Sequence, residues 1–226
     1  MTQPNPTIYT AIPTLQSLKQ AYPGVKSLFF DMDGSLFDTE RFHTQAFLKI
    51  GKDHKVIPPG SLNSVHQLLV GKADHLVYEV VKTWPGFPQH WSAQDFVDIK
   101  TRNLLELLKE IPSRDFFHHE LEGLLKEAKA EGVFIALVTS SEKIITTQLL
   151  ALTGLNKVFD IVITRDDCER HKPDPLPYLK ALQASGSSPA QTIIFEDSQV
   201  GIAAAMAAGA HVVQVGWHPE FDISKI

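Results

Sequence analysis

The second half of the chain alternates between short apolar runs and stretches with helical spacing. The apolar runs predict buried strands over 134–138, 161–163, 192–195 and 211–215. The stretches between them predict helices over 142–152, 175–184 and 200–207, preceded by a helix whose apolar face is Leu121, Leu124, Leu125 and Ala128. This alternation predicts an α/β fold, with a Rossmann-like parallel sheet flanked by helices on both faces.

The beginning of the chain predicts an arm, a short helix and one more strand. Residues 1–13 hold three prolines and are expected to form a flexible or draped arm. A helix over 14–22 is expected to end at the Pro-Gly pair that follows it, and the apolar run over 25–30 predicts the first strand.

Residues 41–111 have little strand character and predict a helical cap inserted after that strand. The segment Ser92–Asp95 is typical of a helix start, and Trp84–Pro88 predicts a turn. The expected organisation is an N-terminal arm and short helix over 1–23, an α/β core over 24–40 and 112–226, and the cap over 41–111.

Two carboxylates leave the first predicted strand together. Asp31 and Asp33 lie one residue apart, and Gly34 follows at once. Because open α/β sheets bind ligands at the carboxyl ends of their strands, both side chains are expected at a binding edge. Such carboxylates suit Mg²⁺, and one of them can also act as a nucleophile. An EF-hand loop is excluded, because its glycine stands at the sixth position and Gly34 stands at the fourth.

Polar residues also follow the later predicted strands. They are the hydroxyl pair Thr139-Ser140, then Lys172, then the acidic pair Glu196-Asp197. Two unit charges about 4 Å apart repel by about 4 kcal/mol at an effective dielectric near 20, so four carboxylates at one edge need positive charge among them. Lys172 and a divalent cation would supply it and would bridge an incoming phosphate. The motifs together predict a metal-dependent phosphoryl-transfer site.

With these motifs the chain resembles the haloacid dehalogenase-like superfamily, in the branch of the phosphoglycolate phosphatases and β-phosphoglucomutases. The resemblance extends from about Ser27 to Val215. Its carriers, in order, are Asp-Met-Asp-Gly-Ser-Leu-Phe-Asp-Thr over 31–39, Thr139-Ser140, Lys172-Pro173, and Phe-Glu-Asp-Ser-Gln-Val-Gly over 195–201 with the alanine-rich stretch behind it. Ser35 departs mildly from the pattern, since threonine or valine is commoner there.

The resemblance implies a role for each motif. Asp31 would attack phosphorus and carry an aspartyl-phosphate, and Asp33 would be the general acid and base. Thr139 and the Ser140 amide would hold the phosphoryl oxygens, while Lys172 would neutralise Asp31 and the phosphoryl group.

The implied cofactor is Mg²⁺, bound by Asp31, the Asp33 carbonyl and Asp197, with Glu196 either a ligand or a neighbour of one. Plainer alternatives stay open for several of these residues. Thr139-Ser140 could simply cap the helix that follows, and we expect this pair both to cap it and to bind phosphate, because a helix N-terminus is itself an anion site. Glu196-Asp197 could also cap the helix that follows it, and Lys172 could be a solvated surface lysine.

The predicted cap holds further candidates for substrate binding. His43 matches a position that is often histidine in this branch, and it is either a packing residue or a substrate contact. Lys72 and Lys100 could meet an anionic substrate, although surface lysines need no special role.

We expect a Mg²⁺-dependent phosphatase that acts on a small phosphorylated metabolite. A β-phosphoglucomutase-type mutase is the alternative, but such enzymes carry an arginine in the cap loop where this chain has Asp74, which would repel a second phosphate. A dehalogenase or a non-catalytic binding module of the same fold fits less well, because all four motifs are intact. The substrate and the oligomeric state stay open.

Composition limits the other classes of function. The 226 residues carry a net charge of −5, which argues against nucleic acid or an anionic membrane as the main partner. The single cysteine, Cys168, allows no internal disulfide and stands among acidic residues, so it is expected to be inert. No apolar stretch is long enough to cross a bilayer and no secretory signal is visible, so a cytoplasmic location is expected.

Overall fold

The structure, a computed structural model, describes residues 6–61, 64–65 and 74–218 and divides into two compact units. Within these residues, the core unit consists of the segments up to Asp38 and from Ser113 onward. The inserted unit consists of residues between Thr39 and Pro112. Each unit has a hydrophobic core of its own.

The core unit contains a six-stranded sheet in the order β1-β6-β5-β2-β3-β4, in which every adjacent pair is parallel. Its strands are β1 (Thr7–Tyr9), β2 (Ser27–Phe30), β3 (Phe134–Val138), β4 (Ile161–Ile163), β5 (Thr192–Glu196) and β6 (His211–Val215). The predicted α/β fold with a parallel sheet is confirmed. The central strands β2 and β5 are buried along their whole length, which is why they read as continuous apolar runs instead of alternating ones.

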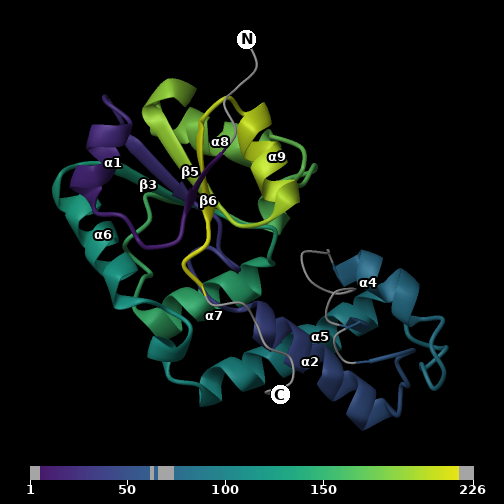
Figure 1. The fold of residues 1–226 in the computed structure, drawn as a ribbon. Helices are drawn as coiled ribbons and strands as arrows, with labels where there is room; N and C mark the ends of the chain where they lie inside the picture. Colours follow the sequence, from purple (N-terminus) through teal and green to yellow (C-terminus); the bar gives the residue numbers. More distant parts are fainter. Residues whose placement is uncertain (1–5, 62–63, 66–73, 219–226) are drawn as a thin grey trace. The chain divides into compact units, whose positions relative to one another are not determined.

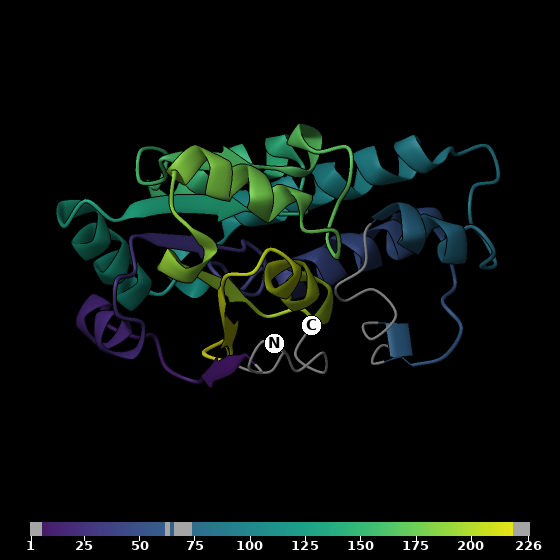
Figure 2. The ribbon, with the colours of Figure 1, turned by 90° about the horizontal axis from the view of Figure 1, so that it is seen from above.

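The prediction of a flexible or draped arm is wrong for Thr7–Tyr9. These residues form β1, which lies beside β6 at the sheet edge (Figure 2). The two strands pair in parallel, with Thr7 opposite Val213. Ile8 in the middle of the strand is largely exposed, and the Gly216 N–H donates to the Tyr9 carbonyl. Backbone pairing at the sheet edge therefore stabilises this strand, and three residues without a buried face leave no periodic signal in the sequence.

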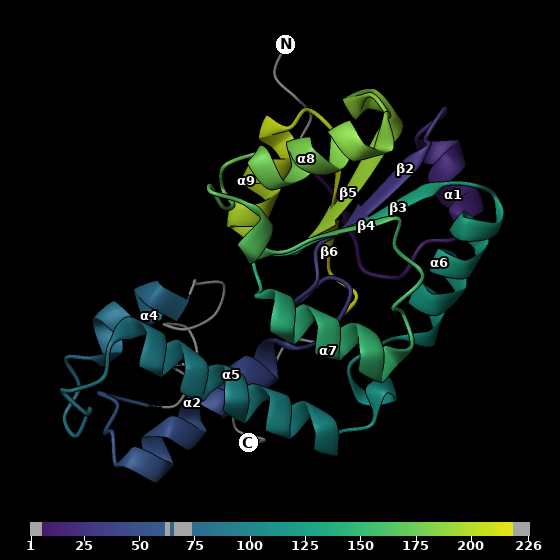
Figure 3. The ribbon, with the colours of Figure 1, turned by 180° about the vertical axis from the view of Figure 1, so that it is seen from behind.

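Helices cover both faces of the sheet. The described helices of the core unit are α1 (Leu15–Ala21), α6 (His119–Ala130), α7 (Lys143–Thr153), α8 (Leu176–Ser185) and α9 (Gln199–Ala207). The strands lie between the pair α1 and α6 and the pair α8 and α9 (Figures 1 and 3). Across the described part of the chain, no helix combines the length and apolar character needed to span a bilayer. The cytoplasmic location stays a prediction.

Helix α9 approaches the sheet closely because its buried face is made of small residues. Ala204 and Ala205 are fully buried and share a cluster with Phe29, Ile194 and Val212 from the strands. A methyl group adds little thickness between helix and sheet, so the packing leaves no room for larger side chains. The core-packing interpretation of this alanine-rich stretch is confirmed.

The inserted unit is helical, as its lack of strand character predicts. Its described helices are α2 (Glu40–His54), α4 (Asp74–Val81) and α5 (Ala93–Glu110). Helix α5 begins with a capping box, in which Ser92 and Asp95 each accept a hydrogen bond from the other's backbone amide. The core of the inserted unit combines aliphatic and aromatic side chains, and Phe47 makes edge-to-face contacts with Trp84 and Phe96.

Two substitutions in α9 test how tightly it packs on the sheet. Ala204→Leu is expected to lower the free energy of unfolding by about 1–3 kcal/mol, because the larger side chain has no space at a fully buried site. The matched change Ala203→Leu, one residue away on the exposed side, is expected to stay within about 0.5 kcal/mol of the wild type. Urea denaturation measures both, and equal stability of the two variants would contradict the packing.

Candidate active site

The loop after β2 turns tightly and brings Asp31 to the sheet edge. The Asp31 N–H donates to the Phe195 carbonyl at 3.0 Å, which ties the loop to β5. The Gly34 N–H donates to the Phe37 carbonyl at 2.7 Å, and Gly34 has φ +80°. A Cβ at Gly34 would lie 2.2 Å from Oδ2 of Asp197, so glycine is needed both for the turn and for this close approach.

Lys172 joins two acidic residues from two neighbouring strand ends. Its ammonium donates to Oδ1 of Asp31 at 2.5 Å, to Oε1 of Glu196 at 2.6 Å and to the Val138 carbonyl at 2.9 Å. Burial alone would lower the pKa of Lys172, but the charges of Asp31 and Glu196 outweigh it and raise the pKa. The ammonium is therefore charged and only 3% exposed, and the interpretation of Lys172 as a solvated surface lysine is wrong.

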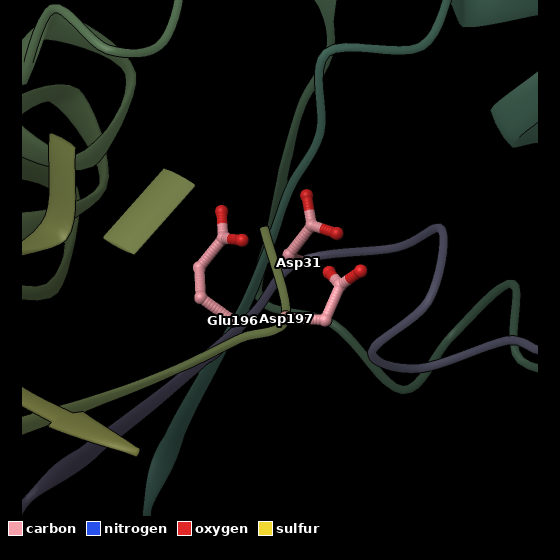
Figure 4. Close-up of side chains that lie close together, drawn as sticks. All are labelled: Asp31, Glu196 and Asp197. Carbon is pink, nitrogen blue, oxygen red and sulfur yellow. The ribbon is translucent and has the colours of Figure 1, made fainter. Parts of the chain in front are cut away.

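Three carboxylates form a group that could hold a metal ion. Asp31, Glu196 and Asp197 each offer an oxygen, and these oxygens lie within 4.8 Å of one another (Figure 4). Burial, followed by the charge of Glu196, raises the pKa of Asp31 well above its ordinary value, although Lys172 acts in the opposite direction. The three carboxylates, when ionised, exceed the charge of the Lys172 ammonium by two negative charges. An oxygen-only donor set with this charge fits a hard divalent cation.

The loop after β3 carries hydroxyl groups, and one of them contacts Asp33, the predicted general acid and base. The side-chain oxygen of Thr139 accepts from the Ser141 N–H at 2.9 Å, and the Ser141 hydroxyl donates to the half-buried carboxylate of Asp33. Ser140 is exposed between them. Helix α7 begins two residues after Ser141 with Glu142 as its N-cap, so the capping interpretation of Thr139-Ser140 is wrong.

The comparisons with known proteins agree with this geometry. Residues 28–215 match the family described as haloacid dehalogenase-like hydrolase. The chain belongs to this family. Four-fifths or more of it aligns with curated relatives, among them the fructose-1-phosphate phosphatase YqaB of Escherichia coli K12, which is 30% identical over 86% of this chain and 98% of its own.

Another relative is the phosphorylated carbohydrates phosphatase of Thermotoga maritima, 27% identical over 82% of each chain. Among solved structures, CbbY from Rhodobacter sphaeroides in complex with phosphate covers 88% of this chain and 91% of its own, with a TM-score of 0.75 and 24% identity. That structural likeness concerns the fold. Together with the family match, the relatives make this chain a haloacid dehalogenase-like phosphatase, a hydrolase of phosphoric monoesters.

Two of the candidates in the inserted unit, His43 and Lys100, belong to one polar cluster within that unit. Lys100 is buried and forms an ion pair with Asp74, and its ammonium lies 3.2 Å from Nδ1 of His43. The interpretation of Lys100 as a surface lysine is therefore wrong. Its side chain is buried, and its ammonium contacts Asp74 and His43. Lys72 lies outside the described residues.

The sequence did not predict the hydroxyl groups that contact Glu196. The Tyr178 hydroxyl donates to Oε1 of Glu196 at 2.6 Å, and the Ser198 hydroxyl donates to Oε2 at 3.2 Å. Ser198 is also the N-cap of α9, where it accepts from the Gly201 N–H, so neither Glu196 nor Asp197 takes the capping role. A hydroxyl directly after an acidic pair was a usable signal for Ser198, whereas a tyrosine at a core-facing helical position gave none.

Gly201 in α9 is expected to be essential for the position of Glu196. A Cβ there would lie 1.9 Å from Oε1 of Glu196, so Gly201→Ala must displace that carboxylate or the helix. We expect a loss of about 1–3 kcal/mol in unfolding free energy, together with a clear loss of phosphatase activity.

The matched control is Gly123→Ala in α6, where an added Cβ meets nothing within 4 Å. Removing a glycine from a helix interior there should leave activity unchanged and raise the unfolding free energy by about 0.5–1 kcal/mol. Chemical denaturation and phosphate release measure both variants, and a fully active Gly201→Ala enzyme would argue against the close approach.

Proposed function

We propose that this chain is a Mg²⁺-dependent phosphatase that hydrolyses a small sugar phosphate through an aspartyl-phosphate on Asp31. The observation that carries the proposal is the buried Lys172 ammonium, held between Asp31 and Glu196 beside Asp197. A carboxylate nucleophile, a fixed cation and a carboxylate group suited to a metal are what phosphoryl transfer requires. The core unit would be the catalytic domain and the inserted unit its cap.

The metal that we propose is Mg²⁺, and Asp31 and Asp197 would hold it, with the Asp33 carbonyl as a further oxygen. Glu196 would either bind the ion directly or hydrogen-bond to groups around the ligands. Both of its oxygens already accept hydrogen bonds, which favours the second role. When bound, Mg²⁺ would offset the charge of the carboxylates and of the phosphoryl oxygens. The missing side chain of Gly34 supports this assignment, because it leaves Asp197 room beside the loop.

In the first half of the reaction, an Asp31 oxygen attacks phosphorus and the bond to the ester oxygen breaks. Asp33 gives its proton to the departing alkoxide, which leaves as an alcohol. Lys172 holds Oδ1 of Asp31 in place and balances charge on the phosphoryl group. Thr139, with the Ser140 amide, is proposed to bind phosphoryl oxygens, and the Ser141 hydroxyl orients the Asp33 carboxylate.

In the second half, Asp33 accepts a proton from water, and the resulting hydroxide attacks phosphorus. The bond between phosphorus and Asp31 then breaks and inorganic phosphate leaves, which restores the Asp31 carboxylate and leaves Asp33 protonated for the next cycle. The two halves need Asp33 first as an acid and then as a base. A half-buried carboxylate with a hydroxyl donor, as observed for Asp33, suits a group that changes its proton twice in each cycle.

The substrate class that we propose is a phosphorylated carbohydrate. The curated relatives named above are a phosphatase of fructose 1-phosphate and a phosphatase of phosphorylated carbohydrates. We favour hydrolysis over the mutase alternative because the buried cation Lys100 of the inserted unit is already paired with Asp74. An acidic group beside that lysine disfavours the binding of a second phosphate.

Mg²⁺ and Asp31 are tested together. The wild type is expected to release phosphate from a chromogenic ester only with Mg²⁺, and at a concentration of 100 Kd the ion should stabilise it by about 2.7 kcal/mol. Asp31→Asn is expected to abolish turnover, because an amide cannot attack phosphorus, and to weaken the stabilisation by Mg²⁺. Thermal unfolding with and without the ion supplies the second measurement.

The control for this experiment is Asp53→Asn, which removes a carboxylate paired with Lys49 on the exposed surface of α2. That variant should keep both its turnover and its response to Mg²⁺. Robust phosphate release in EDTA, or by Asp31→Asn, would exclude the proposed chemistry.

The choice between phosphatase and mutase is tested with a panel of sugar monophosphates, including fructose 1-phosphate and β-glucose 1-phosphate. Inorganic phosphate and isomerised sugar phosphate are quantified in the same samples. We expect the wild type to release phosphate without isomerised product. If a single substitution introduces isomerisation, we expect it to be Asp74→Arg, which places a cation where a second phosphate would bind. Accumulation of glucose 6-phosphate by the wild type would reverse the assignment.

A further inference from the structure

Tyr178 is a fully buried side chain that contacts the site through its hydroxyl and its ring. It comes from α8, and its hydroxyl donates to Oε1 of Glu196 at 2.6 Å. The Lys172 ammonium donates to the same oxygen and lies 4.9 Å from the centre of the tyrosine ring. Tyr178 therefore touches both members of the Lys172–Glu196 ion pair.

Glu196 is fixed from all sides. Oε1 accepts from Lys172 and Tyr178, Oε2 accepts from Ser198, and the position of Gly201 leaves no space for a movement toward α9. The side chain is completely buried, so no water replaces a donor that is removed. The orientation of this carboxylate thus depends on donors from three different segments of the chain.

The position of Lys172 depends in turn on Glu196. The ammonium has three protons, and three acceptors take them: Asp31, Glu196 and the Val138 carbonyl. If the Glu196 carboxylate rotates, the ammonium must follow it or give up one of its hydrogen bonds. Either change alters the distance between Lys172 and Asp31, and catalysis is sensitive to such small displacements.

We propose that Tyr178 is a positioning residue for phosphoryl transfer, which holds Glu196 and through it aligns Lys172 with Asp31. The inference rests on the proposed function of the site. Tyr178 itself touches no reacting atom. Its loss is expected to lower the rate of the chemical step and the affinity for the metal, and to leave the affinity for the sugar phosphate unchanged.

The variant Tyr178→Phe keeps the ring and removes only the hydroxyl. We expect kcat with Mg²⁺ to fall about 10- to 100-fold, the range typical of residues that orient a ligand from behind, while KM for the sugar phosphate stays within about twofold. Calorimetric titration with Mg²⁺ alone, without substrate, is expected to show weaker binding in the same variant.

Tyr78→Phe is the matched control. It removes a tyrosine hydroxyl that donates to the Trp91 carbonyl at 2.9 Å, in the inserted unit. Tyr78→Phe should change stability and leave kcat and Mg²⁺ binding at wild-type values, because both Tyr78 and its partner Trp91 lie in the inserted unit, whereas the proposed metal ligands lie in the core unit.

A double-mutant cycle shows whether Tyr178 acts through Glu196. In a Glu196→Gln background, adding Tyr178→Phe should reduce kcat by less than threefold, because the carboxylate that the hydroxyl positions is gone. The same background removes the buried charge, so it keeps the test available if Tyr178→Phe alone does not fold. Additive losses, or wild-type kcat and Mg²⁺ binding in Tyr178→Phe, would overturn the inference.

Failure of this inference is distinguishable from failure of the proposed function. If the wild type needs Mg²⁺ and Asp31→Asn is inactive, the proposed chemistry stands whatever Tyr178→Phe does. If the wild type releases no phosphate from any sugar phosphate, the proposed function fails first.

Discussion

One ion pair network determines what the core unit can do: the Lys172 ammonium between Asp31 and Glu196. Three carboxylates from the ends of β2 and β5 converge at one edge of the sheet, two of them buried and Asp197 half-buried, so their mutual repulsion and the loss of hydration oppose folding. One lysine offsets part of that cost, and the divalent ion that we propose would match the two remaining negative charges. In the proposed mechanism, stability and catalysis would therefore depend on the same positive charges, which an anionic substrate also needs.

The rest of the core unit holds these charges in place. Parallel strands deliver Asp31, Glu196 and the Val138 carbonyl to one edge because β3, β2 and β5 are neighbours in the sheet. Two glycines keep the space open: a side chain at Gly34 would collide with Asp197, and one at Gly201 would collide with Glu196. The hydroxyls of Tyr178 and Ser198 then orient Glu196 from behind.

In the inserted unit, the buried positive charge is paired within the unit itself. Its Lys100 is buried with Asp74 and His43 at its side, so the positive charge is satisfied within the unit. The core unit presents an acidic group that demands cations, whereas this cluster is close to neutral. This contrast is why we propose that the phosphate chemistry takes place in the core unit.

The sequence by itself determined the elements that a local pattern encodes. The strands over 134–138, 161–163 and 211–215 have the predicted bounds, and the helix start at Ser92 is where its capping pattern indicates. The acidic and hydroxyl residues at the strand ends were also evident, because each lies next to an apolar run. Only the tertiary structure decided that Tyr178 meets Glu196, that Lys172 is buried beside a residue 141 positions away, that Lys100 pairs with Asp74, and that Thr7–Tyr9 adds an edge strand. These contacts join segments that are distant along the chain, and they arise from the packing of whole elements, which no local pattern of residues records.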